Sequence, residues 1–238
     1  MHRIVFRWSS VVLLSLLAGV CAAQDSTKRN DRPKSDPVPA PVIKQRDNDP
    51  TRYTWEFAQP QFLINHIVVE HDAVGHGKVS FNRKGDEETV TEPIELSSPV
   101  LQKIADLWTA LRFLDSTENY QASKNFAHLG TYKLRMSDGA RQRTTEFNWS
   151  DNSDAWNLAQ EYRRVADQAI FIFDINVARE NQPLNTPGLM TYLESLYNRN
   201  ALSDPKQLVP LLKDLRTDAH IPLIARNQAD RLLKKIDK

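Results

Sequence analysis

The sequence from Phe62 to Phe81, FLINHIVVEHDAVGHGKVSF, decides how this chain is expected to fold. β-branched and aromatic residues fill both of its ends, and Gly75 and Gly77 stand between them. Such runs favour strands, and glycines supply the backbone conformations that tight turns need. The stretch therefore predicts a β-hairpin that pairs about 62–71 with 77–83.

Further strands are expected on both sides of this hairpin. The pattern is strand-like from about 53 to 94, and a strand is expected near Thr89–Leu96. Farther along, Tyr132–Trp149 contains two alternating apolar runs around the dipeptide Asp138-Gly139. Because Asp-Gly between alternating runs is typical of a hairpin turn, a second antiparallel pair is expected there.

Two helices are expected between and after these hairpins. Ser98 and Pro99 have the character of an N-cap followed by a first helical residue, and apolar residues then recur every three or four positions to Leu114. A long helix is predicted from near Ser153 to about Asn181, before Pro183. This order of elements predicts an α+β fold, an antiparallel sheet packed by helices on one face.

The chain after residue 184 is expected to be all helical. Thr186-Pro187 and Asp204-Pro205 each precede a leucine-rich segment. The second segment, DPKQLVPLLKDLRTDAHIPLIARNQADRLLKKI (204–236), resembles a single HEAT-type helical hairpin. The resemblance implies a helix pair used for protein contacts, and one copy cannot form a solenoid. The α+β part also resembles uncharacterised exported bacterial proteins, a likeness that carries no site residue.

The N-terminal residues predict export. Arg3 and Arg7 precede an uncharged apolar run, VVLLSLLAGV (11–20), and small residues follow it. This arrangement is typical of a secretory signal peptide over 1–23, and the run is short for a membrane span. Cys21, the only cysteine, lies in a poor match to the bacterial lipoprotein pattern, so ordinary cleavage is favoured over lipid attachment.

The rest of the organisation follows from composition. Residues 24–50 hold five prolines, mixed charges and few large apolar residues, so they are expected to be a disordered linker. An α+β domain over 51–183 and a C-terminal HEAT-like segment over 184–238 are expected to follow. No transmembrane helix is expected in the mature chain, which is assigned to the periplasm or the extracellular space.

Charge and motifs narrow the classes of function. Removing residues 1–23 takes away two arginines and no acid, which leaves 29 basic against 30 acidic residues. This balance gives no reason to expect a nucleic-acid partner. Phosphate-binding glycine loops, dinucleotide-binding glycine patterns and nucleophile-elbow motifs are absent from the sequence, so no cofactor and no catalytic residue is assigned.

Two groups of residues are candidates for a site. His71, Asp72 and His76 lie on the first hairpin and are residue types that bind zinc, but strand alternation places His71 on the opposite face from Asp72. The polar segment 115–128 carries the second group, Tyr120, Phe126 and His128. Long polar segments are common at binding sites, although Tyr120 and Phe126 could equally attach this loop to the core.

These observations favour an exported, non-catalytic binding or interaction module. Its expected partner is a protein or another envelope component, contacted by the 115–128 loop and by the exposed face of the C-terminal helices. Two alternatives stay open. One is a metal-dependent or other hydrolase that uses the histidines of the first hairpin. The other is a small-ligand carrier with a pocket between the sheet and the long helix.

Overall fold

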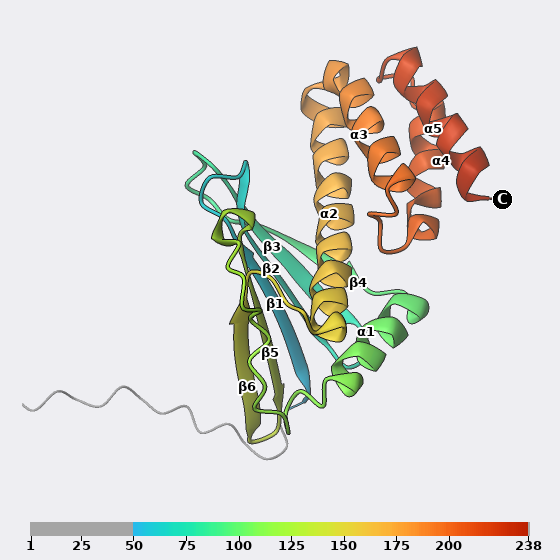
Figure 1. Cartoon of the computed structure of the whole chain (residues 1–238). Coiled ribbons are helices and arrows are strands. Elements are labelled where there is room, and N and C mark those ends of the chain that lie inside the picture. The colour runs from blue at the N-terminus through green and yellow to red at the C-terminus, as the bar shows by residue number, and fades with distance from the viewer. Residues whose placement is uncertain (1–49, 238) are drawn as a thin grey trace, which may run out of the picture. The chain divides into compact units, whose positions relative to one another are not determined.

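Six strands form one antiparallel sheet in the order β4-β3-β2-β1-β5-β6 (Figure 1). The computed structural model describes residues 50–237, so the expected signal peptide and nearly all of the expected linker lie outside the described residues. The strands are β1 (Arg52–Ala58), β2 (Ile64–Asp72), β3 (His76–Arg83), β4 (Val90–Glu95), β5 (Thr131–Asp138) and β6 (Arg141–Phe147). Both expected hairpins are present, β2 with β3 and β5 with β6.

The central strand β1 joins the two hairpins. It pairs with β2 on one side, where Trp55 lies opposite Val69, and with β5 on the other, where Trp55 lies opposite Leu134. All three of these side chains are fully buried. The sequence prediction did not separate this strand from the hairpin that follows it, although Tyr53, Trp55 and Phe57 alternate in the manner of a strand.

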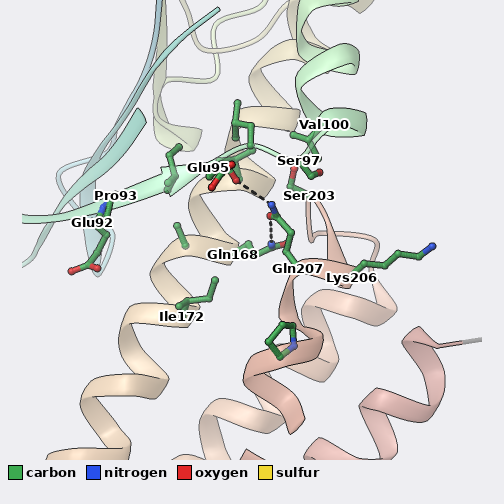
Figure 2. A pocket seen from close by; sticks show the side chains of 15 residues that line it. Glu92, Pro93, Glu95, Ser97, Val100, Gln168, Ile172, Ser203, Lys206 and Gln207 are labelled. Atoms are coloured by element: carbon green, nitrogen blue, oxygen red, sulfur yellow. Dashed lines mark hydrogen bonds between the residues drawn. The ribbon is translucent and has the colours of Figure 1, made fainter. Parts of the chain in front are cut away.

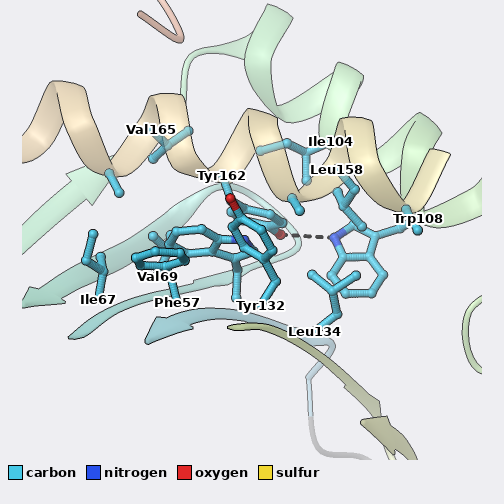
Figure 3. Packing of buried hydrophobic residues seen from close by; sticks show 14 of the residues in the cluster. Phe57, Ile67, Val69, Ile104, Trp108, Tyr132, Leu134, Leu158, Tyr162 and Val165 are labelled. Atoms are coloured by element: carbon cyan, nitrogen blue, oxygen red, sulfur yellow. Dashed lines mark hydrogen bonds between the residues drawn. The ribbon is translucent and has the colours of Figure 1, made fainter. Parts of the chain in front are cut away.

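Helices α1 (Ser98–Ala110) and α2 (Ser153–Asn181) cover one face of the sheet (Figure 1). The α+β prediction is therefore confirmed. Helix α1 begins one residue earlier than expected, at Ser98, so its N-cap is Ser97 rather than Ser98. Alternate side chains of the strands meet both helices in one core, which includes Phe57 and Leu134 of the sheet and Leu158 and Tyr162 of α2 (Figure 3). Buried side chains fill the layer between the central strands and the long helix, so this part of the layer holds no pocket of the kind that the carrier alternative would need.

A directional chain of hydrogen bonds crosses this core. The Nδ1 of His71 lies 2.7 Å from the backbone oxygen of Asp72, which can only accept, so Nδ1 carries the proton. The Nε2 of neutral His71 therefore accepts, and the Tyr162 hydroxyl, 2.7 Å away, donates to it. The same hydroxyl accepts from the indole N–H of Trp108 at 3.0 Å. Every polar atom of this buried chain is thus satisfied.

A second hydrophobic cluster holds the C-terminal helices. It joins α3 (Thr186–Asn198), α4 (Val209–Thr217) and α5 (Leu223–Ile236) to the far half of α2 through Phe171 and Ile175. Short 3-10 turns, η2 (Pro183–Asn185) and η3 (Pro205–Leu208), precede α3 and α4, and a third, η1 (Ala127–Leu129), precedes β5. The expected helical hairpin is thus α4 with α5. Across residues 50–237, no helix combines the length and apolar character that membrane crossing requires.

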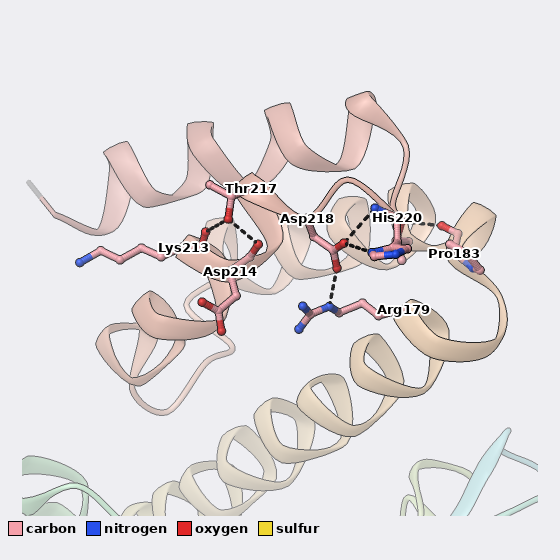
Figure 4. Close-up of polar contacts among 8 residues, drawn as sticks. Arg179, Pro183, Lys213, Asp214, Thr217, Asp218 and His220 are labelled. Atoms are coloured by element: carbon pink, nitrogen blue, oxygen red, sulfur yellow. Dashed lines mark hydrogen bonds and ion pairs between the residues drawn. The ribbon is translucent and has the colours of Figure 1, made fainter.

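The turn between α4 and α5 is tied to α2 by a single carboxylate (Figure 4). One oxygen of Asp218 accepts from the backbone N–H and the ring of His220, and the other accepts from Arg179 at 3.0 Å. The hydrogen bond from the His220 backbone, followed by Arg179, holds the pKa of Asp218 below its usual value. This contact fixes the end of the helical hairpin on the long helix.

Candidate functional site

A cleft lies between the edge of the sheet and the C-terminal helices (Figure 2). Its cavity has a volume of about 490 Å³. We call it the β4 cleft. Three parts of the chain line it: β4 with the following turn and the start of α1, the middle of α2, and the segment that carries η3 and the start of α4. The lining residues are Glu92, Pro93, Ile94, Glu95, Leu96, Ser97, Val100, Val165, Gln168, Ala169, Ile172, Ser203, Lys206, Gln207 and Pro210.

One wall of the β4 cleft is the open edge of the sheet. Strand β4 pairs with β3 on one side only, and the backbone N–H of Leu96 donates toward that side, to Gly75. Because hydrogen-bonding direction alternates along a strand, Ile94 and Glu92 also face β3, whereas Thr91, Pro93 and Glu95 face outward. The outward direction of Glu95 is seen directly, since its carbonyl accepts from the side chain of Gln207 at 3.0 Å.

Two glutamines hold the opposite wall in place (Figure 2). Gln168 of α2 is buried, and its side-chain oxygen accepts from the backbone N–H of Asp204 at 3.0 Å. Its amide nitrogen donates to the side-chain oxygen of Gln207 at 3.4 Å, and the amide nitrogen of Gln207 donates to the carbonyl of Glu95. A continuous chain of amides therefore links the long helix, η3 and the sheet edge across the inner end of the cleft.

Ser97, which lines the β4 cleft, has a buried hydroxyl that the described residues leave unpaired. Ser97 is the N-cap of α1, yet its side chain makes no capping hydrogen bond. Its oxygen is buried and has no hydrogen-bond partner within residues 50–237. Because an unpaired buried hydroxyl costs free energy, a polar ligand group that bound it would gain that energy back.

A buried carboxylate lies next to the β4 cleft and binds groups from the surrounding segments. Glu161 of α2 is 1% exposed, and its Oε2 lies 2.6 Å from Lys103 of α1 and 2.6 Å from Arg164. The hydroxyl of Ser203, which also lines the cleft, is 3.2 Å away. Two cations and a hydroxyl thus satisfy Glu161, so it acts as a structural tie between α1, α2 and the turn before η3.

The edge strand carries an excess of negative charge. Between residues 86 and 95 the chain has five acidic and no basic residues. Within the described part of the chain, none of these five carboxylates forms an ion pair; they are Asp86, Glu87, Glu88, Glu92 and Glu95. By contrast, the outer face of the central strands has paired charges, such as Lys78 with Glu70 and Lys133 with Glu56.

The three candidate residues of the polar loop separate in the structure. Tyr120 is buried in the core, where its ring stacks near Phe113 and Arg143 lies over it. Phe126 packs edge-on against Trp149, and the exposed ring of His128 lies beside Phe126, with 6.1 Å between their centroids. The structure therefore brings Phe126 and His128 together at the surface and assigns Tyr120 to packing.

The three candidate metal ligands do not converge. Both ring nitrogens of buried His71 are used in the hydrogen-bond chain of the core. Asp72 accepts from the backbone N–H groups of Val74 and His76, and its other oxygen is 4.0 Å from the His76 ring. Among residues 50–237, no group of three or more His, Cys, Asp and Glu side chains is placed to hold a metal ion.

The β4 cleft itself was not among the sequence candidates. Its walls come from three segments that are about 70 and 40 residues apart along the chain. The one local signal was the acidic run before and along a strand that contains a proline. Comparison with other proteins does not assign the cleft either, because the chain matches no protein-family model and no curated protein.

Proposed function

We propose that this chain is an exported, non-catalytic binding protein and that the β4 cleft is its ligand site. The observation that carries this proposal is the combination of a cavity of about 490 Å³ with an open strand edge and a free buried hydroxyl, Ser97. Ligand sites are typically concave and mostly apolar, with a few polar groups that fix orientation. The cleft has this composition.

The groups in the β4 cleft suit binding of an amide-rich ligand. They are backbone carbonyl and N–H groups of β4, the side-chain amide of Gln207 and the hydroxyl of Ser97. Val165, Ala169 and Ile172 supply an apolar surface on α2. The signal-peptide pattern over 1–23 supports a binding event in the periplasm or outside the cell.

Site-specific photo-crosslinking in the producing cell tests the proposal. A photoreactive residue would replace Lys206, which lines the β4 cleft, and, in separate variants, His128 of the loop or Glu180, an exposed residue at the far end of α2. We expect an adduct from position 206 and none from position 180. The adduct should disappear in Ala169→Phe, which fills the cavity, while the melting midpoint of that variant stays unchanged.

Other crosslinking patterns would assign binding to a different surface or contradict the proposed site. An adduct from position 128 alone would assign binding to the Phe126–His128 surface of the loop. Adducts of equal yield from positions 206 and 180, or none from 206, would contradict the β4 cleft as a binding site.

A small-ligand carrier is the second candidate, and the volume of the cavity is the observation that favours it. A space of about 490 Å³ falls within the usual range of small-molecule sites, which is roughly 300–1,000 Å³. Native mass spectrometry of the gently purified protein separates the two candidates. A bound small molecule that Ala169→Phe excludes would indicate a carrier, whereas a mass equal to that of the polypeptide alone would favour a macromolecular partner.

A further inference from the structure

The open edge of β4 has the hydrogen-bonding groups of an incomplete sheet. Thr91 directs both its N–H and its C=O outward, Pro93 directs its C=O outward, and Glu95 directs its N–H outward. The carbonyl of Glu95 is already bound by Gln207. Another strand placed along this edge would satisfy the remaining groups, as in the known recognition of extended peptides by strand addition.

The side-chain amide of Gln207 already binds one end of this edge, at Glu95. Its side chain donates to the Glu95 carbonyl, the contact that a backbone N–H of an added strand would make, and its oxygen accepts from the amide of Gln168 on α2. A primary amide and a peptide group have the same donor and acceptor chemistry. The edge beyond Gln207, toward Thr91, is where a ligand strand would continue this ladder.

The cavity lies where one row of side chains of an added strand would point. Ile94 and Glu92 stand opposite Gly77 and Val79 of β3, so their side chains lie on the helix-covered face of the sheet. Side chains of a neighbouring strand alternate between the two faces in the same way. Every second residue of the ligand would therefore face Ala169 and Ile172 across the cavity, which favours apolar residues there.

The negative charge of the edge determines which residues are favoured at the other positions of the ligand strand, those that face away from the cavity. The five acidic side chains of 86–95 have no ion-pair partners within the described chain, and they flank the edge on β4 and on the turn before it. Acidic residues on an edge strand repel strands that carry negative charge, and a proline there removes one backbone N–H donor. Both features therefore oppose the addition of most strands. The same features favour a partner with complementary positive charge.

We propose that the ligand of the β4 cleft is an extended, basic polypeptide segment of a partner protein that adds to β4 as a seventh strand, with alternate apolar side chains in the cavity. This inference rests on the proposed function and names the chemistry of its ligand. Lysine or arginine side chains of the segment lie next to Glu95 and the acidic turn, and its backbone pairs with Thr91 and Glu95.

The test uses a blocked hexapeptide of alternating lysine and valine, and fluorescence anisotropy measures its binding to the purified exported protein. Thr91→Pro removes an outward N–H and leaves the pairing with β3 intact, because the nitrogen of Thr91 faces away from β3. Thr91→Val is the matched control, since it also loses the contact with Ser80 but keeps the N–H.

We expect Thr91→Pro to weaken binding about three- to tenfold, the effect of one lost hydrogen bond, and Thr91→Val to leave it within about twofold. Glu95→Gln should also weaken binding, whereas Glu180→Gln, at a carboxylate far along α2 that forms no ion pair within residues 50–237, should not. Methylation of every second peptide nitrogen should abolish binding without any change to the protein, and a glutamate–valine hexapeptide should not bind.

Several outcomes would overturn the inference. Failure of the lysine–valine peptide to bind would do so, as would equal affinity of Thr91→Pro and Thr91→Val or tolerance of the methylated peptide. A protein dimer that Thr91→Pro dissociates would assign the edge to a second copy of the chain. A cleft-specific adduct at position 206 without peptide binding would leave the proposed function standing and remove only the strand-addition inference.

Discussion

The hydroxyl of Tyr162 takes part in two buried hydrogen bonds of the core. It donates to His71 and accepts from Trp108, and all three side chains are buried. Tyr162→Phe removes one oxygen and leaves two buried polar atoms without partners, so we expect it to lower the free energy of unfolding by about 1–3 kcal/mol. Chemical denaturation measures the change. Tyr192→Phe is the control, because its half-exposed hydroxyl makes no hydrogen bond in the described chain, and an equal loss in both variants would contradict the account.

His71 predicts how stability depends on pH. Burial lowers the pKa of His71 below its ordinary value of 6.5, and the hydrogen-bond chain uses the neutral ring. Between the lowered pKa and 6.5 the unfolded chain therefore binds more protons than the folded chain. Stability is complete above pH 6.5 and falls as pH decreases through this window.

The corresponding measurement is the free energy of unfolding at a series of pH values from 7.5 down to about 5, where the usual titration of histidine ends. His71→Phe keeps an aromatic ring against Tyr53 but cannot titrate, so its profile should be flatter over this range than that of the wild-type protein, although its stability is lower throughout. Parallel profiles would show that His71 does not carry the dependence.

At the scale of single elements, the local turns and helices were predictable and the central strand was not. The Asp138-Gly139 turn and the start of α2 depend on neighbouring residues, and both occur where the sequence placed them. Strand β1 gains its position from pairing with β5, which begins more than seventy residues later along the chain. No local turn encodes such a pairing, so the alternation of Tyr53, Trp55 and Phe57 was not enough to assign it.

The candidate sites also divide into features that the local sequence predicted and features that depend on tertiary packing. Strand alternation correctly separated the side chain of His71, which is buried, from that of Asp72, which accepts from backbone groups of the exposed turn. The β4 cleft needed tertiary information, because β4, α2 and η3 are ordinary elements when read one at a time. The acidic run 86–95 was visible, but its proximity to a cavity depends on where the C-terminal helices pack.

The contact of Asp218 gives a prediction for the α4–α5 pair. Asp218→Ala removes the acceptor for the His220 backbone and for Arg179, so it should cost about 1–2 kcal/mol and loosen the turn. Hydrogen exchange should become faster at residues 217–221 while the strands of the sheet keep their protection. Asp214→Ala is the matched control on the same helix, because the Asp214 side chain is exposed and only its backbone oxygen is bound, by Thr217 (Figure 4). Equal exchange in the two variants would contradict the role of Asp218.

At the scale of the whole molecule, the long helix α2 connects two hydrophobic clusters. Its first part packs on the sheet, and its second part, from Phe171, packs on α3, α4 and α5. The β4 cleft lies beside the middle of α2, where the sheet ends and the C-terminal helices begin. The contacts of Glu161 and Gln168 hold this junction, so the geometry of the cleft depends on both clusters at once.

The most direct test of the central claim is a backbone amide NMR titration with the lysine–valine hexapeptide. We predict chemical-shift changes at Thr91, Glu95 and Ala169, with the amides of Thr91 and Glu95 shifting in the direction of a new hydrogen bond. Residues 115–128 should keep their positions. Changes confined to Phe126 and His128, or none at the β4 edge at saturating peptide, would contradict the assignment of the β4 cleft as the binding site.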